Sequence, residues 1–134
     1  MAELDTEQLL NVYQEQKWDD KKFLSYLRED FFCQDGAFYA VWIDDCSYKA
    51  AVRFCPYKDG SLLHSLETAP ADRRKGYAFS LLHQTLRYLQ TTDCSTVYSH
   101  IEKRNIASFL LHKKCGFVVI SDSASYLDGT VTQY

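Results

Sequence analysis

The order of helical and extended segments along the 134 residues predicts one α+β domain, in which helices cover the faces of a sheet. Two observations predict this class. Residues 62–68 form an apolar run typical of a buried strand, and after Gly76 apolar residues recur with a period of 3.6, at positions 78, 81, 82, 86 and 89. Further β-rich runs precede this pair and alternate with another helix after it. Residues 1–134 are therefore expected to form a single domain.

Two helices are expected at the start of the chain. Asp5 or Thr6 is placed to cap a first helix, whose apolar positions are 9, 10 and 13. The acidic pair at positions 19 and 20 precedes a second helix, which should end near residue 29 or 30.

Extended segments follow. Residues 37–43 and 48–55 are β-rich and are separated by a turn-like stretch, so they predict an antiparallel hairpin. A turn at residues 57–60 leads into the apolar strand, which Pro70 ends.

After the long helix, residues 96–101 alternate as a strand does. Asn105 can cap a last helix, and Gly116 is a typical helix end after Lys113 and Lys114. Residues 117–121 and 130–134 are the remaining expected strands.

Composition narrows the possible functions. The net charge of −3 argues against general nucleic-acid binding, which needs a basic surface. The five cysteines are odd in number and show no CxxC spacing, so neither a disulfide framework nor a metal site is expected. Free cysteines suit a reducing cytoplasm. We also expect no association with a membrane, since no apolar run approaches spanning length and the first residues lack a signal core.

Three cations and a glycine, Arg73, Arg74, Lys75 and Gly76, stand at the start of the long helix. Free N–H groups, the helix dipole and these cations would together bind a pyrophosphate well. The alternative is a solvated basic loop without a ligand.

Arg73, Gly76 and Ala78, with Pro70 before them, resemble the acyl-CoA-binding signature of the GNAT family of N-acetyltransferases: Arg or Gln, two residues, Gly, one residue, then Gly or Ala. Residues 105–117 resemble the later helix of this family, which starts with Asn and ends in Lys, one residue and Gly-Phe. The two segments occur in the family's order and at about its spacing.

The resemblance implies a mostly antiparallel mixed sheet with splayed middle strands, and acetyl-CoA as cosubstrate. It also implies one more strand before the first helix, which is short or missing here. The pantetheine arm would lie along the strand that precedes the signature, and the pyrophosphate would bind the N–H groups from Arg74 to Ala78. The expected cofactor-binding residues are Leu66, Glu67, Thr68, Arg73, Arg74, Lys75, Gly76, Tyr77, Ala78, Asn105 and Ser108.

His112 stands where many family members carry a Tyr that is thought to protonate the departing CoA thiolate. An imidazole titrates near pH 6.5, so a protonated fraction could serve as that acid. The alternative is a histidine that only packs on the sheet. Asn105, Ser108 and His112 form one stripe of the helix, and Ile106, Phe109 and Leu110 are expected in the core.

Glu67 is the carboxylate best placed to act as the general base, because it lies on the central strand. Its alternative role is an ion pair with a nearby cation, and His64 and His100 are the other base candidates. Strand alternation places Ser65 on the same face as Glu67, and His64 on the opposite face.

These features predict an N-acetyltransferase that moves an acetyl group from acetyl-CoA to a primary amine of a small molecule or protein, by direct attack. We expect a monomer or homodimer. One alternative is a non-catalytic CoA-binding or regulatory module. Another is an acyl-enzyme route through Cys94 or Cys115. Aromatic residues could line an acceptor pocket, namely Tyr13, Trp18, Phe38, Tyr39, Trp42 and Tyr126.

Overall fold

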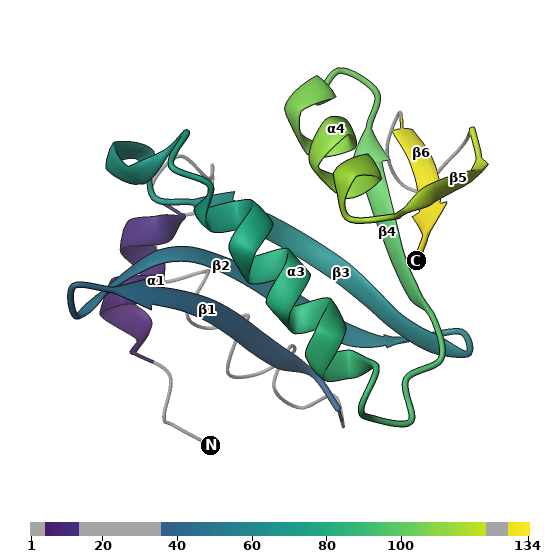
Figure 1. Ribbon diagram of the computed structural model, residues 1–134, viewed down its shortest axis with the longest axis horizontal. Helices are drawn as coiled ribbons and strands as arrows, with labels where there is room; N and C mark the ends of the chain where they lie inside the picture. The colour runs from purple at the N-terminus through teal and green to yellow at the C-terminus, as the bar shows by residue number, and fades with distance from the viewer. Residues whose placement is uncertain (1–4, 14–35, 123–128) are drawn as a thin grey trace.

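The computed structural model describes residues 5–13, 36–122 and 129–134. Within these ranges, six strands form one mixed sheet in the order β1-β2-β3-β4-β6-β5, in which β3 and β4 are parallel and the other neighbours antiparallel (Figure 1). The strands are β1 (Phe38–Asp44), β2 (Ser47–Tyr57), β3 (Gly60–Thr68), β4 (Val97–Glu102), β5 (Val118–Ser121) and β6 (Gly129–Gln133). The predicted α+β class and the mostly antiparallel mixed sheet are therefore confirmed.

Helices cover both faces of this sheet. Helix α1 (Thr6–Val12) packs on one face, and α3 (Tyr77–Leu89) and α4 (Ile106–Lys114) lie on the other (Figure 1). Asp5, one of the two caps that the sequence allowed, caps α1 by accepting a hydrogen bond from the Gln8 N–H. The second predicted helix lies outside the described residues. None of the helices that the structure describes is long and apolar enough to cross a membrane.

The two middle strands separate soon after they meet. Their ladder joins only Ser61 to Val97, Leu62 to Tyr98 and Leu63 to Ser99. Beyond this point β3 continues to Thr68 and β4 to Glu102, each without the other. The predicted splay of the middle strands is therefore confirmed.

A bulge in β3 changes which side chains share a face. Ala51 pairs with Glu67 and Arg53 pairs with His64, so β3 carries one residue more than β2 between these pairs. Ser65, within the bulge, has a φ of 50°. Directly opposed residues share a face, so Glu67 and His64 both point to the α1 side of the sheet. The expectation from simple alternation was wrong, because it assumed a regular strand.

Helix α4 presents an unexpected face to the protein. Ile106 and Leu110 are 66% and 57% exposed, whereas His112 is 2% exposed. The expectation that Ile106 and Leu110 belong to the core was wrong. Leu111 and Cys115 pack against the core beneath α3 instead, and this orientation turns Ser108 and His112 toward the sheet.

Candidate functional site

A cavity of about 550 Å³ occupies the gap between β3 and β4. Five of the predicted site residues line it: Leu66, Glu67, Asn105, Ser108 and His112. They come from three elements, the bulged end of β3, the loop that follows β4, and α4. Thr68 and residues 73–76, which we call the basic turn, do not line this cavity. The predicted residues therefore divide into a cleft group and a group at the start of α3.

Two residues just before α3 have left-handed backbone angles. Arg74 and Gly76 have φ values of 65° and 84°, and a Cβ added at Gly76 would meet nothing within 4 Å. Glycine is favoured at position 76 by this backbone angle rather than by a close neighbour. The Ser80 N–H makes the first helical bond, to the Gly76 carbonyl at 3.0 Å. The N–H groups just ahead of it, including those of Tyr77 and Ala78, have no intrahelical acceptor.

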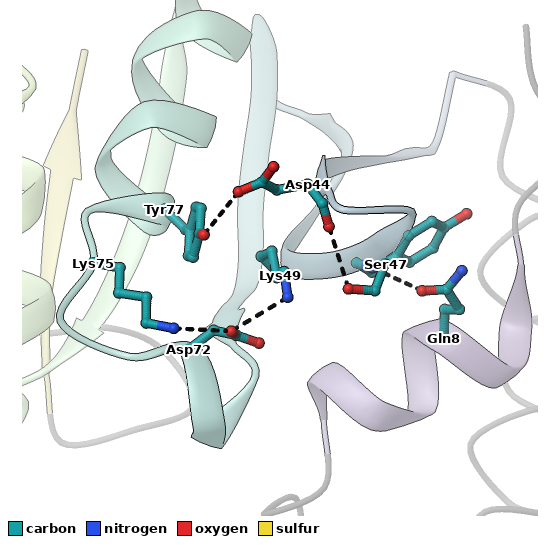
Figure 2. A network of polar contacts seen from close by, with 8 residues as sticks. Gln8, Asp44, Ser47, Lys49, Asp72, Lys75 and Tyr77 are labelled. Atoms are coloured by element: carbon teal, nitrogen blue, oxygen red, sulfur yellow. Dashed lines mark hydrogen bonds and ion pairs between the residues drawn. The ribbon is translucent and has the colours of Figure 1, made fainter.

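Ion pairs attach the basic turn to the sheet. Asp72 lies 3.4 Å from both Lys49 of β2 and Lys75 of the turn (Figure 2). The Tyr77 hydroxyl donates to Asp44 of β1 at 3.0 Å, and this bond raises the pKa of Tyr77 (Figure 2). The Lys75 ammonium therefore has a carboxylate partner, Asp72, three residues earlier in the chain.

Glu67 takes part in a second contact with the turn. Its Oε2 lies 3.8 Å from Arg73 Nη2, and its side chain is 34% exposed. Arg73 Nε also donates to the Thr68 carbonyl at 3.4 Å. The ion pair considered as the alternative role of Glu67 is thus present. Its role as a base stays a prediction.

His112 is held at both ring nitrogens. Nδ1 lies 2.7 Å from the Ser108 carbonyl oxygen, and Nε2 lies 2.8 Å from Ser99 Oγ. A carbonyl only accepts, so Nδ1 carries the hydrogen. Burial lowers the pKa of His112, and the bond to Ser108 opposes this shift without cancelling it. Burial therefore favours the neutral imidazole, so a smaller protonated fraction is expected at pH 7 than for a free histidine.

Asn105 has the capping role that the sequence predicted. Its side-chain oxygen accepts a hydrogen bond from the Ser108 N–H at 3.1 Å. A role toward a cofactor stays a prediction.

Ser99 and Arg53 also line the cavity, and they were not among the predicted residues. Arg53 is the one charge within the apolar run Ala50–Cys55, and this position could have identified it. Its charge lowers the pKa values of Tyr13 and Cys55 against the larger opposing effect of burial. Ser99 is a small polar residue in an alternating strand, and the sequence alone gives no signal for its role.

The two histidine candidates for the base also lie in the cleft. Burial, with smaller contributions from Arg53 and His100, lowers the pKa of His64 to about 4. Burial, together with the charge of Lys58, lowers the pKa of His100. Both rings are neutral at pH 7, and His64 is a weak base.

Comparison with known proteins identifies the family. The profile described as the acetyltransferase (GNAT) family matches residues 3–117. The chain belongs to the GNAT acetyltransferase family. No curated protein matches this GNAT chain closely enough to count as a relative.

Solved structures share its fold at low identity. Ribosomal-protein-alanine N-acetyltransferase from Brucella melitensis is 20% identical with a TM-score of 0.76, over 97% of this chain and 93% of that one. PaiA N-acetyltransferase from Thermoplasma acidophilum, in complex with coenzyme A, is 14% identical with a TM-score of 0.71, over 96% and 91%. A variant of spermidine N-acetyltransferase SpeG from Vibrio cholerae is 16% identical with a TM-score of 0.76, over 97% and 87%.

None of the four cysteines within the described part of this GNAT chain lines the cleft cavity. Burial raises the pKa of Cys115, and the Cys94 thiol lies 3.4 Å from the Thr96 carbonyl. Neither thiol is therefore placed for an acyl-enzyme route through this cavity. Among the described residues, no three His, Cys, Asp or Glu side chains converge as metal ligands do.

The aromatic residues proposed for an acceptor pocket lie on both faces of the sheet. Tyr13 and Tyr39 pack on the α1 side, whereas Phe38 and Trp42 pack in the core beneath α3. Trp18 and Tyr126 lie outside the described residues.

Proposed function

We propose that this GNAT chain is an acyl-CoA-dependent N-acyltransferase, which transfers acetyl from acetyl-CoA to a primary amine of a small molecule or protein by direct attack. The observation that carries the proposal is the separation of β3 from β4 after Leu63 and Ser99. This separation leaves a cavity of about 550 Å³ between two strand edges. The open N-terminus of α3 follows β3 in the chain.

A pantetheine arm suits such a gap, because its amides can pair with free strand edges as another strand would. The backbone from Leu66 to Thr68 offers these edges on β3. The pyrophosphate would bind the N–H groups at the start of α3, where Gly76 leaves open space. The bound coenzyme A of the Thermoplasma relative supports this cosubstrate.

The chemistry requires two substrates held in line. The amine attacks the thioester carbonyl, a strand N–H binds the oxyanion, and the thiolate leaves. Glu67 would accept the proton of the amine from the α1 side of the sheet, where its side chain points. In this arrangement Arg73 must release or share that carboxylate during turnover.

A non-catalytic CoA-binding module is the second candidate. Two observations favour it: Glu67 is paired with Arg73, and His112 is buried and neutral. The two candidates share the cofactor site and differ only in turnover.

Release of free thiol from acetyl-CoA separates them. The acceptor panel should contain a peptide with an N-terminal alanine and spermidine, the acceptors named for two structural neighbours, together with free amino acids. The enzyme proposal predicts amine-dependent thiol release that saturates with acetyl-CoA. Binding of acetyl-CoA without release above the amine-free rate, across the whole panel, would leave the binding-module proposal.

A further inference from the structure

His112 cannot offer a free ring nitrogen to a ligand in the cleft. Nδ1 is bound to the Ser108 carbonyl and Nε2 to the Ser99 hydroxyl, at 2.7 and 2.8 Å. The ring of Phe117 lies against it edge to face, with centroids 4.9 Å apart. Any proton that passes between this imidazole and the cleft must therefore pass through a neighbour. The Ser108 hydroxyl lies 3.4 Å from Nδ1, whose hydrogen is directed at the Ser108 carbonyl, whereas the Ser99 hydroxyl meets Nε2, the nitrogen that can gain or lose a proton.

Ser99 lies at the inner end of the cleft. It is opposite Leu63 in the last pair that joins β3 to β4, and it lines the cavity. Its carbonyl accepts a hydrogen bond from the Thr132 hydroxyl of β6 at 3.2 Å, which fixes the strand at this point. The six residues from Leu63 to Thr68 are five steps apart and span roughly 16 Å when extended. A pantetheine arm that runs along this stretch from the outer end of β3 would bring its sulfur toward the inner end of the cleft, where Ser99 lies.

We propose that the Ser99 hydroxyl is the group that meets the thioester sulfur, and that His112 is a positioning residue that acts through it. This inference rests on the proposed function, because it assumes acyl-CoA in the cleft. It differs from the expectation for the family, in which the side chain at position 112 itself meets the sulfur.

The protonation state of His112 sets the direction of the hydroxyl. When the ring is neutral, Nε2 can only accept, so the Ser99 O–H donates to the ring. When Nε2 is protonated, it donates to Ser99 Oγ, and the Ser99 hydrogen turns toward the cleft. The Nδ1 hydrogen stays on the Ser108 carbonyl in both states.

The proton movement during transfer follows from this geometry. As the C–S bond breaks, its electron pair stays on sulfur, and sulfur takes the proton of Ser99 Oγ. Ser99 Oγ takes the Nε2 proton of the imidazolium in the same step, so the step depends on the minor, protonated form of His112, which burial disfavours. The products are the free thiol, a neutral Ser99 hydroxyl and a neutral His112. His112 regains its proton from solvent before the next turnover.

Kinetics of matched variants test the pair. Ser99→Ala should lower kcat about 10²-fold, the lower range for general acid catalysis, while the dissociation constant for CoA stays within a few-fold. Ser99→Thr keeps the hydroxyl and should recover most of the rate. Ser99→Ala combined with His112→Phe should be no slower than Ser99→Ala alone, since both act in one path. Thr85→Ala, which removes a buried hydroxyl in α3 away from the cleft, is the control and should keep full turnover.

Each contrary kinetic result overturns the inference. Full turnover by Ser99→Ala would show that the hydroxyl is dispensable. If the loss of kcat in the double variant equals the product of the two single losses, Ser99 and His112 act independently. A protein that gains one acetyl group at Ser99 from acetyl-CoA, seen by mass spectrometry, would make Ser99 a nucleophile instead.

Imidazole ¹⁵N NMR tests the same contact without turnover. Added CoA should shift the Nε2 resonance of His112 in the wild type, and this shift should disappear in Ser99→Ala. An undiminished shift in Ser99→Ala would mean that the ring meets the sulfur directly. That result would overturn this inference but not the proposed function. If CoA does not bind to the folded wild type, the proposed function and this inference fail together.

Discussion

The hydroxyl of Tyr13, at the end of α1, donates a hydrogen bond to the carbonyl of Ser65 in the bulge of β3. It also lies 3.4 Å from the Ala51 carbonyl of β2. A helix at the start of the chain is thereby tied to the strand that forms one wall of the cleft. Because the peptide group is planar, holding the Ser65 carbonyl also holds the Leu66 N–H.

Tyr13→Phe should therefore destabilise the protein and also slow catalysis. The variant leaves the buried Ala51 carbonyl and the partly buried Ser65 carbonyl without this donor, which costs about 1–3 kcal/mol of unfolding free energy. Urea denaturation measures this cost, and thiol release should show a lower kcat. Tyr48→Phe is the control, because its hydroxyl accepts from the Asp5 N–H away from the bulge. A Tyr13→Phe protein with wild-type stability and kcat would contradict the role of this contact.

Substitutions at Gly76 test the anion site with strain held constant. Asn and Asp have the same shape, and both tolerate the left-handed φ of 84° better than most residues. Only Asp brings a negative charge to the phosphate position. Gly76→Asp should bind acetyl-CoA at least ~10-fold more weakly than Gly76→Asn, since the lost charge complementarity exceeds about 1.4 kcal/mol. Equal affinities in calorimetry would remove the start of α3 from the binding site.

Glu67→Gln distinguishes a base from an ion-pair partner. It keeps the shape of the side chain and removes the proton acceptor. If Glu67 is the base, Glu67→Gln should lower kcat/KM by ~10²-fold or more and leave CoA affinity unchanged. If Glu67 is only the ion-pair partner of the exposed Arg73, Glu67→Gln should lower the free energy of unfolding by at most about 1 kcal/mol. The shape of the pH–rate profile should then stay the same. An unchanged rate in a stable variant would return the base role to His100, His64 or water.

Acid should destabilise this protein through its buried histidines. The unfolded chain binds a proton at His64 near pH 6.5, whereas in the folded protein the pKa of His64 is about 4. Between these values the unfolded state holds more protons, so the free energy of unfolding falls as the pH drops from about 6.5 to about 4.

Melting temperatures across this range check that direction. His64→Gln should flatten the decline, because it removes the group whose pKa is lowered on folding. A wild-type melting temperature that rises from pH 6.5 to pH 4 would contradict the assignment.

The elements of the fold could be predicted from the sequence because each has a local cause. Periodicity located α3, Asp5 and Asn105 located two helix starts, and Gly76 marked the turn before α3. The family resemblance supplied the splay of β3 and β4, which no local pattern reveals. Each of these predictions relied either on residues near one another in the chain or on the resemblance to a known family.

The site chemistry depends on contacts between distant segments, so it could not be predicted in the same way. Simple alternation placed Glu67 and His64 on opposite faces. The bulge in β3 brings them to the same face, and it depends on pairing with β2, which the local sequence does not reveal. The hydrogen bond at Nε2 of His112 depends on Ser99, which belongs to another element. The exposure of Leu110 depends on how α4 is rotated against the sheet.

We propose that acyl-CoA binds in the cleft between β3 and β4 and at the start of α3. Equilibrium dialysis of folded wild-type protein against labelled acetyl-CoA tests this binding. We expect saturable binding of one acetyl-CoA per chain, displaced by unlabelled CoA and weakened in Gly76→Asp relative to Gly76→Asn. Labelled acetyl-CoA that distributes equally across the membrane, with the protein folded throughout, would show that this site does not hold acyl-CoA.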